Sequence, residues 1–425
     1  MADNISKQMA FLQKLRPLAV VALRWAVGAV FIFSGLAKGI DLWGVIYKVS
    51  DYLDAFGWEW AMPYVDAVSV MVPVVEFTIG VLLFAGSFRR VSVWLALAIM
   101  AFMLPLTAYI AIYEPVADCG CFGEAWIISN TATFWKNVAI TLALVFLLWK
   151  NRTVRSLYGP AVQWLTVVFP VVYLLVVMAI GYKSQPLIDF RPYKTGTYII
   201  GEHGGTDGVE YSFVYEKDGV RKQFSLENLP DTTWTFVDRK EHVPDTVVNA
   251  GKTVNRIAFF DGDYDVTDEV LPAEGDVLLL LIPDLSEVNV ASTFRINEMY
   301  ESLSDSGIMM ICLTGGSDSE ISDWREMSMA NYPIYKMDDT VIKTMARGNP
   351  ALVRVNDGMI VWKMSLDAVD LTDIHKMDAE TGDGFSALVG LTALLILLMA
   401  ILLVVNRTPL LVKFTIRLKK NRKKK

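Results

Sequence analysis

Cysteine and histidine are scarce in this chain of 425 residues. The cysteines are Cys119, Cys121 and Cys312, and the three histidines are scattered. So few cysteines cannot form the disulfide framework of a small secreted scaffold, and no Cys/His spacing typical of a zinc site is present. The basic residues lie at helix ends and in a terminal tail rather than on one folded face, which excludes a nucleic-acid footprint. We therefore expect neither a bound metal nor a nucleic-acid partner.

Long apolar runs are absent between residues 183 and 375, although the mean hydropathy of the whole chain is +0.38. The apolar residues are concentrated elsewhere, in runs of the length that crosses a bilayer. We expect six transmembrane helices, at Pro17–Ile40, Pro63–Phe88, Val91–Tyr113, Phe134–Trp149, Val162–Tyr182 and Phe385–Val405. The first is expected to be retained, because no small-residue cleavage motif follows it.

Charge is distributed unevenly along the chain. Residues 184–382 carry 35 Asp+Glu and 17 Lys+Arg, a net of −18, whereas the remainder carries 11 and 22, a net of +11. Most of the bases outside this segment form clusters before the first helix, after the second, after the fourth and in the C-terminal tail. By the positive-inside rule, both termini are cytoplasmic, and the 114–133 loop and the acidic segment are extracytoplasmic. We expect a multi-pass protein of a bacterial inner (cytoplasmic) membrane, in contact with the lipid bilayer.

The segment between the fifth and sixth helices has two halves. Residues 184–270 are expected to be β-rich, because Phe213–Tyr215 and Thr233–Val237 are β-branched and aromatic and Lys217–Gly219 has turn residues. From residue 271, buried-strand patterns alternate with helical periodicity. The expected elements are a strand at Asp276–Pro283, a helix at Val290–Ser304, a strand at Ile308–Leu313, a helix at Ser319–Met329, a strand at Pro333–Tyr335, a helix at Thr340–Ala346, and a hairpin of Asn349–Val355 and Met359–Lys363.

This order of elements, with a proline opening the hairpin, resembles the thioredoxin fold. The resemblance implies that Pro350 is cis and faces the place of the family's Cys-x-x-Cys pair. That place holds no cysteine here, and the loop contains Pro283, Asp284 and Ser286. We interpret Cys312, inside a strand, as a buried and inert thiol. The domain is expected to bind a partner through Pro350 and this loop without doing dithiol chemistry itself.

The first four helices resemble the DoxX/MauE group of membrane proteins, and the MauE branch in particular. The resemblance rests on Arg24, the run Phe33–Lys38, Glu76 with Gly80, the run Asp118–Gly123 and Trp135–Asn137. The Asp-Cys-Gly-Cys-Phe-Gly run is the most specific of these. The resemblance implies thiol–disulfide work on extracytoplasmic proteins, in association with thioredoxin-like domains.

The pair Cys119-Gly120-Cys121 lies in a loop expected to face an oxidising compartment. A disulfide between residues i and i+2 closes a very small strained ring, which restricts little of the unfolded chain and is readily reduced. The intervening glycine permits the unusual dihedrals that such a ring needs. Redox exchange with clients is the leading interpretation. A permanent structural disulfide, and a metal-binding or free dithiol, are the alternatives.

Charged residues inside the predicted helices are a second signal, because they are costly in a bilayer and usually paired. Arg24 and Glu76 are expected at depths from which they can meet. They then form either a structural clamp between helices or a site for a quinone or another polar headgroup. Lys38 and Lys136, at outer helix ends, are interpreted as snorkelling anchors, although either could lower the pKa of the nearby thiols.

The predicted fold is an α-helical membrane bundle with an extracytoplasmic α/β thioredoxin-like domain and a β-rich insertion. The bundle comprises a four-helix DoxX/MauE-like core and two further helices. The predicted boundaries are 1–158 for the core, 159–183 for the fifth helix, 184–270 for the β-rich segment, 271–382 for the thioredoxin-like domain and 383–425 for the sixth helix and tail.

The leading functional hypothesis is a membrane thiol–disulfide oxidoreductase that uses Cys119 and Cys121 on an extracytoplasmic client, with a quinone as candidate carrier. The alternative is a non-enzymatic factor that binds an envelope partner. A transporter is a weaker possibility, because no broken helix or inverted repeat stands out.

Overall fold

The computed structural model describes residues 2–116, 118–150, 156–200, 210–217, 220–225, 235–242, 247–249, 252–254, 256–272, 274–369 and 384–422. Side chains are described from residue 17 to 200, 256 to 369 and 384 to 407 within those ranges. The chain forms two compact units. Unit 1 comprises Met1–Phe190 with Glu380–Lys425, and unit 2 comprises Arg191–Ala379.

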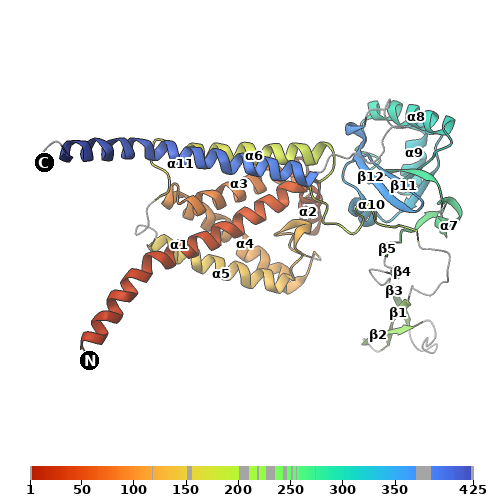
Figure 1. The fold of residues 1–425 in the computed structure, drawn as a ribbon. Helices are drawn as coiled ribbons and strands as arrows, with labels where there is room; N and C mark the ends of the chain where they lie inside the picture. Colours follow the sequence, from red (N-terminus) through yellow and green to blue (C-terminus); the bar gives the residue numbers. More distant parts are fainter. Residues whose placement is uncertain are drawn as a thin grey trace. The chain divides into compact units, whose positions relative to one another are not determined.

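Unit 1 is helical (Figure 1). Its helices are α1 (Ala2–Ile40), α2 (Leu42–Ala55), α3 (Val65–Ala85), α4 (Arg89–Tyr113), α5 (Asn130–Lys150), α6 (Leu165–Lys183) and α11 (Gly384–Arg422), with short 3-10 turns η1 (Glu59–Tyr64) and η2 (Gly123–Ala125). Six stretches are long and apolar enough to cross a membrane, among the residues that the structure describes. They coincide with the six predicted spans, which are therefore confirmed.

Unit 1 differs from the expectation in the length of its two terminal helices and in one additional helix. α1 and α11 continue as helices through the charged ends of the chain, where lysine and arginine have favourable helix propensity. The loop after α1 contains a helix that was not predicted, α2, whose N-cap is Asp41. The Asp41 carboxylate accepts a hydrogen bond from the backbone N–H of Gly44 at 3.0 Å, which begins the helix immediately after α1 ends.

The backbones of α1 and α3 touch because small residues lie at their interface. A Cβ atom at Gly35 would lie 2.5 Å from the backbone nitrogen of Phe77, and one at Gly80 would lie 2.5 Å from that of Ile32. Buried side chains of α1, α3, α4 and α5 form the core of these four helices. α6 and α11 lie side by side, and the hydroxyls of Tyr173 and Thr392 are 2.8 Å apart (Figure 1). The close contact of α1 and α3 fixes which residues of the two helices face each other.

Unit 2 contains a seven-stranded mixed sheet in the order β12-β11-β8-β9-β10-β6-β7. The strands are β6 (Phe259–Asp261), β7 (Tyr264–Asp265), β8 (Asp276–Ile282), β9 (Met309–Thr314), β10 (Ile334–Met337), β11 (Ala351–Asn356) and β12 (Met359–Ser365). β8, β9 and β10 are parallel neighbours, whereas β11 and β12 are antiparallel. The helices of this unit are α7 (Thr267–Val270), α8 (Val290–Asp305), α9 (Asp318–Ser328) and α10 (Asp339–Met345).

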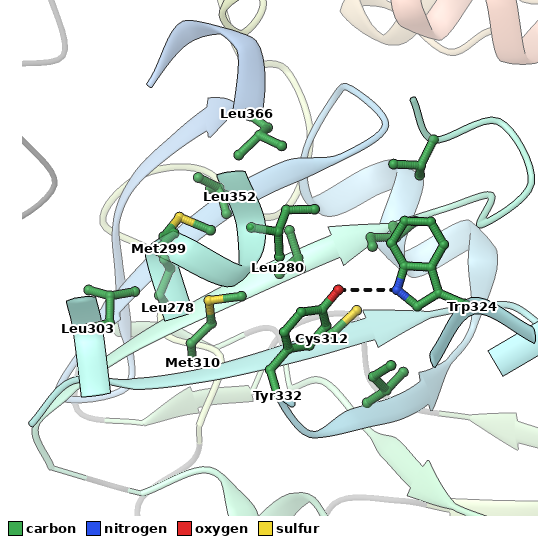
Figure 2. Close-up of a cluster of buried hydrophobic side chains, with 14 of the residues drawn as sticks. Leu278, Leu280, Met299, Leu303, Met310, Cys312, Trp324, Tyr332, Leu352 and Leu366 are labelled. Atoms are coloured by element: carbon green, nitrogen blue, oxygen red, sulfur yellow. Dashed lines mark hydrogen bonds between the residues drawn. The ribbon is translucent and has the colours of Figure 1, made fainter. Parts of the chain in front are cut away.

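The central strand β8 is apolar throughout because both faces of the sheet are covered. Leu278, Leu280 and Ile282 face a core that includes residues of α8 and α9, while the alternate residues face a second core with α10 (Figure 2 shows part of the first core). Cys312 is fully buried in the first core, and its burial raises the pKa of the thiol. Its predicted place inside a strand, as a buried thiol, is confirmed.

The local signals predicted the elements of this domain well. The Ser317 hydroxyl accepts a hydrogen bond from the Glu320 backbone at 3.4 Å, and Glu320 accepts one from the Ser317 backbone at 2.7 Å, so a capping box begins α9. Asp357 and Gly358 both have positive φ, as the two-residue turn of the hairpin requires. The peptide bond Asn349–Pro350 is cis, as predicted. The strand order and this proline give unit 2 a thioredoxin-like fold.

The predicted β-rich segment contains a three-stranded sheet in the order β2-β1-β3 and a two-stranded sheet of β4 and β5. The bounds are β1 (Glu210–Lys217), β2 (Val220–Ser225), β3 (Thr235–His242), β4 (Val247–Asn249) and β5 (Lys252–Val254). The strand predicted at Phe213–Tyr215 lies within β1, and β1 pairs with β2 in antiparallel fashion. The predicted turn residues 218–219, and residues 233–234 of the other predicted strand, lie outside the described residues.

Candidate functional site

A buried ion pair joins α1 to α3 in unit 1. The Lys38 ammonium lies 2.7 Å and 2.9 Å from the two carboxylate oxygens of Glu76, and the two side chains are only 10% and 8% exposed. The ammonium also donates to the Ser34 hydroxyl at 3.2 Å. Ser34, Lys38 and Glu76 face one another because the α1–α3 glycine contacts lie next to them in both helices.

This pair corrects two expectations. Lys38 was expected to be a snorkelling anchor, but it is buried and bonded to Glu76. Arg24 was expected to meet Glu76, but its guanidinium lies against Gly86 at the C-terminal end of α3. Gly86 is ten residues beyond Glu76, about 15 Å along the helix axis. Arg24 therefore lies near the negative end of the α3 dipole, where a cation is favoured. The structure does not bring Arg24 and Glu76 together.

The loop that carries the thiols is joined to the buried residues Ser34, Lys38 and Glu76. The Ser34 hydroxyl lies 2.8 Å from Glu76 Oε2 and 2.7 Å from the carbonyl oxygen of Cys121, so either oxygen can accept its proton. Phe122, next in the chain, is buried, and the Lys136 ammonium lies 4.3 Å from the centroid of its ring. The pair Cys119-Gly120-Cys121 is therefore joined to the Lys38–Glu76 pair through one hydroxyl.

Helix α2 holds the same loop from its other side. The Tyr52 hydroxyl donates to the carbonyl oxygen of Cys119 at 2.8 Å, and Lys48 pairs with Asp118 at 3.0 Å. The other oxygen of the Asp118 carboxylate accepts from the backbone N–H of Gly120 at 2.7 Å. Gly120 has φ +63°, in the left-handed region that glycine adopts without strain. Analysis of the sequence missed Tyr52 and Lys48, although Asp41 as an N-cap followed by apolar residues was a usable signal for α2.

The two thiols are adjacent and free. The Sγ atoms of Cys119 and Cys121 are 3.1 Å apart, within hydrogen-bond distance. Cys119 is buried, and Cys121 is half-buried. The hydrogen bond from Cys119 lowers the pKa of Cys121 to about 6; burial opposes this change, and the positive charges of Lys136 and Lys38 assist it. The same hydrogen bond and burial raise the pKa of Cys119.

A cavity of about 510 Å³ lies beside the thiols. Cys119, Cys121, Lys38, Glu76 and Lys136 line one part of it. The remaining wall is largely apolar, with contributions from α1, α2, α3, α4 and α5. This volume lies in the range of pockets that hold small organic ligands. Sequence analysis did not predict the cavity, because it forms only when five helices are assembled.

In unit 2, the loop in the place of the Cys-x-x-Cys pair is fixed to the residue before the cis-proline. Asn349 Nδ2 donates to the carbonyl oxygen of Asp284 at 2.7 Å, and the Asp284 N–H donates to Asn349 Oδ1 at 3.4 Å. Asp284 also accepts from the Ser286 hydroxyl at 2.6 Å. Pro350 is buried and Pro283 half-buried, whereas Asp284 and Ser286 are exposed. The predicted neighbourhood of Pro350 and this loop is confirmed, and their binding of a partner stays a prediction.

Among the residues that the structure describes, no three His, Cys, Asp or Glu side chains form a group that could hold a metal ion. The site is instead a pair of adjacent thiols above a buried ion pair and beside a largely apolar cavity. Together with the six spans, it defines a multi-pass membrane protein with a dithiol site, joined to a thioredoxin-like domain without a cysteine pair.

Residues 16–150, which contain this whole site, match the family described as "Methylamine utilisation protein MauE". The membrane domain is thus MauE-like, as the resemblance implied. Residues 209–244 match a "Domain of unknown function (DUF8463)". No curated protein matches the chain. The family match and the adjacent thiols together indicate a redox-related membrane protein in contact with the lipid bilayer.

Solved structures give only distant likenesses. The bacterioferritin comigratory protein of Xanthomonas campestris is 10% identical, with a TM-score of 0.19, and the match covers 29% of this chain and 82% of that one. A thioredoxin-like protein from Bacteroides caccae is 9% identical, with a TM-score of 0.22, and the match covers 72% of this chain and 74% of that one. At such scores the likeness carries no argument. The description of unit 2 as thioredoxin-like rests on its strand order and cis-proline.

Proposed function

We propose that this protein is a membrane thiol–disulfide redox protein that oxidises extracytoplasmic client proteins through Cys119 and Cys121. The observation that carries the proposal is the 3.1 Å approach of two free thiols, one with a lowered pKa, in a loop outside the spans. A thiolate is the reactive form of cysteine in exchange reactions. A stabilised thiolate also favours the reduced form of the pair, which makes its disulfide an oxidant.

The exchange reaction needs only the Cys119–Cys121 disulfide and two thiolates of the client. A client thiolate attacks one sulfur of the Cys119–Cys121 disulfide, forms a mixed disulfide and releases the other sulfur as a thiolate. The second client thiolate then attacks the client sulfur of the mixed disulfide, which forms the client disulfide and leaves both protein cysteines reduced. The client loses two electrons and two protons, and the cysteine pair gains them.

The extracytoplasmic placement of the thiols is part of the proposal. Arg89 and Lys150 lie at the ends of α4 and α5 remote from the thiol loop, and basic residues favour the cytoplasmic side. The end of α6 that leads toward unit 2 lies against the end of α1 that precedes α2, because a Cβ atom at Gly181 would lie 2.8 Å from the carbonyl oxygen of Ile40. We therefore propose an inner-membrane protein with cytoplasmic termini and with unit 2 and the thiols on the same extracytoplasmic side.

Unit 2 is proposed as the docking domain for the client or another envelope partner. Asp284 and Ser286 are exposed beside the buried Pro350, so they offer polar contacts at the edge of a thioredoxin-like fold. Cys312 contributes no chemistry, because its thiol is fully buried. The absence of a cysteine pair in this domain favours the second candidate function, a non-enzymatic assembly factor that binds an envelope partner.

Single serine variants distinguish the two functions. In Cys119→Ser and Cys121→Ser the internal disulfide cannot form, but the remaining thiolate can still attack the disulfide of an oxidised client, which is the reverse of the last exchange step. The neighbouring thiol that would displace the client from this mixed disulfide is absent, so we expect the mixed disulfide to accumulate in cells. It is detected by acid quenching, alkylation and non-reducing electrophoresis. Cys312→Ser is the matched control and should trap nothing. When Asp284→Ala/Ser286→Ala is added to a single serine variant, the amount of client captured should fall. When the same two changes are made in the protein that keeps Cys119 and Cys121, the redox state of these cysteines should not change.

If both single variants trap nothing and retain full function, the redox proposal fails and the assembly-factor function takes its place. If trapping occurs but Asp284→Ala/Ser286→Ala captures as much client as the parent, the docking role of the loop fails while the redox function stands.

A further inference from the structure

The cavity beside the thiols is divided into a polar end and an apolar part. Ser34, Lys38 and Glu76 lie at the polar end with Cys121. The apolar wall is made of residues within the membrane spans of α3 and α4, where no charged side chain lines it except Glu76. These residues are Val68, Val72, Met100, Phe102, Met103 and Leu106. A ligand that fits this distribution has a polar head and an apolar body.

The proposed function leaves a reduced cysteine pair that must lose two electrons and two protons before the next client. Cys312 is fully buried in the core of unit 2 and offers no second thiol. A co-reactant that matches the cavity beside Cys121 is lipid-soluble and accepts two electrons together with protons. Quinones combine an apolar body with two carbonyl oxygens that become hydroxyls on reduction.

We propose that the cavity binds a quinone from the membrane, with its ring beside Cys121 and Glu76, and that the quinone reoxidises the cysteine pair. The inference rests on the proposed function. The Cys119 thiol, the Cys121 thiolate, one proton from water and the quinone are converted into the Cys119–Cys121 disulfide and the quinol. One S–S bond and two O–H bonds form, the S–H bond of Cys119 breaks, and the quinone gains the two electrons that the sulfurs lose.

The buried ion pair has a defined task in this reaction. The Lys38 ammonium lines the cavity, where its three hydrogen bonds go to the Ser34 hydroxyl and to the two carboxylate oxygens of Glu76. An ammonium in a site of low dielectric stabilises the negative charge that develops on a quinone oxygen. Lys38 and Glu76 are thus placed as positioning residues at the quinone head. Arg24, which lies at the other end of α3, takes no part.

The test uses the full-length protein, purified in lipid nanodiscs and reduced, with ubiquinone-1 as the probe. We expect one quinone to be reduced, seen as a loss of quinone absorbance, for every two thiols that the protein loses. Cys121→Ser should abolish this reduction of the quinone. Met103→Trp, which fills the apolar wall, should slow the quinone reaction at least tenfold. Leu95→Trp on the same helix, at a position that is 45% exposed and outside the cavity, should leave it unchanged. Oxidation by glutathione disulfide, measured in parallel, should be equal in both tryptophan variants.

The two oxidants and the two tryptophan variants separate a failure of the quinone inference from a failure of the proposed redox function. If glutathione disulfide oxidises the pair but the quinone does not, the quinone inference is overturned and the proposed redox function stands. If neither oxidant forms the disulfide, both fail. If the quinone reacts equally in Met103→Trp and Leu95→Trp, the quinone reacts outside the cavity and the inference is again overturned. If Met103→Trp also loses the glutathione reaction, Val72→Phe, which fills the same wall from α3, replaces it under the same criteria.

Discussion

The buried ion pair between Lys38 and Glu76 gives the sharpest energetic prediction. Lys38→Met removes the ammonium and leaves the Glu76 carboxylate in a site where both side chains are 10% exposed or less, with Ser34 as its remaining polar contact. Breaking a buried pair in this way typically costs about 3–5 kcal/mol, because the surviving charge is uncompensated. We therefore expect Lys38→Met to lower the free energy of unfolding by about 3 kcal/mol.

The double variant Lys38→Met/Glu76→Leu should be much less costly than the sum of its parts. Replacing a whole buried pair with apolar side chains of similar volume is often neutral or stabilising. We expect the double variant to lie within about 1 kcal/mol of the natural protein, so that adding Glu76→Leu restores most of the roughly 3 kcal/mol lost in Lys38→Met. Lys183→Met is the control. Lys183 is exposed at the end of α6, so the change should stay within about 0.5 kcal/mol.

Reversible unfolding in mixed detergent micelles, followed by tryptophan fluorescence, measures all four proteins. A cost below about 1 kcal/mol for Lys38→Met would show that water or lipid headgroups already solvate this site, against the burial described. A double variant that is at least as unstable as Lys38→Met would show that the two side chains are not coupled. Either result refutes the reasoning that places this pair in a dry interior.

Two further predictions concern the thiols and the α1–α3 contact. Alkylation of Cys121 in the reduced protein should slow as the pH falls through about 6, because the lowered pKa keeps the thiolate present above that value. Cys119→Ser should shift the midpoint of this pH dependence. An unchanged midpoint would contradict the hydrogen bond from Cys119 as the cause of the lowered pKa. Gly35→Ala should cost about 1–3 kcal/mol of unfolding free energy, because its Cβ would lie 2.5 Å from the Phe77 backbone nitrogen. Gly390→Ala on α11, where a Cβ meets nothing within 4 Å, should be close to neutral, and equal effects would refute the close contact.

The sequence predicts the elements whose pattern is set locally. The six spans are apolar over a full bilayer thickness, so their positions follow from hydropathy alone. β8 is predictable because a strand covered on both faces is apolar at every position. The hairpin at Asp357–Gly358 is predictable because the turn needs two residues with positive φ. Helix α2 was missed because its short amphipathic pattern lies in a loop between two spans.

The candidate site is predictable only as far as its cysteines. Cys119 and Cys121 stand out because their spacing is unusual, whereas the partner of Glu76 depends on the register of α1 against α3. Depth estimates placed Arg24 and Glu76 together, but the register places Lys38 opposite Glu76. Lys38 at a helix end is consistent with either a snorkelling or a buried side chain. Its burial depends on the packing of α3 and of the thiol loop against α1, and no local pattern in the sequence records this packing.

One dithiol that serves both a client and a quinone imposes an order on the proposed reaction. The same two sulfurs, Cys119 and Cys121, must form the mixed disulfide and later meet the quinone ring, so neither step can begin until the other has ended. The half-buried Cys121 lies in the loop outside the spans and also lines the cavity, so both proposed co-reactants must reach the same sulfur. The kinetics that follow are ping-pong, in which client oxidation and quinone reduction alternate on a single disulfide.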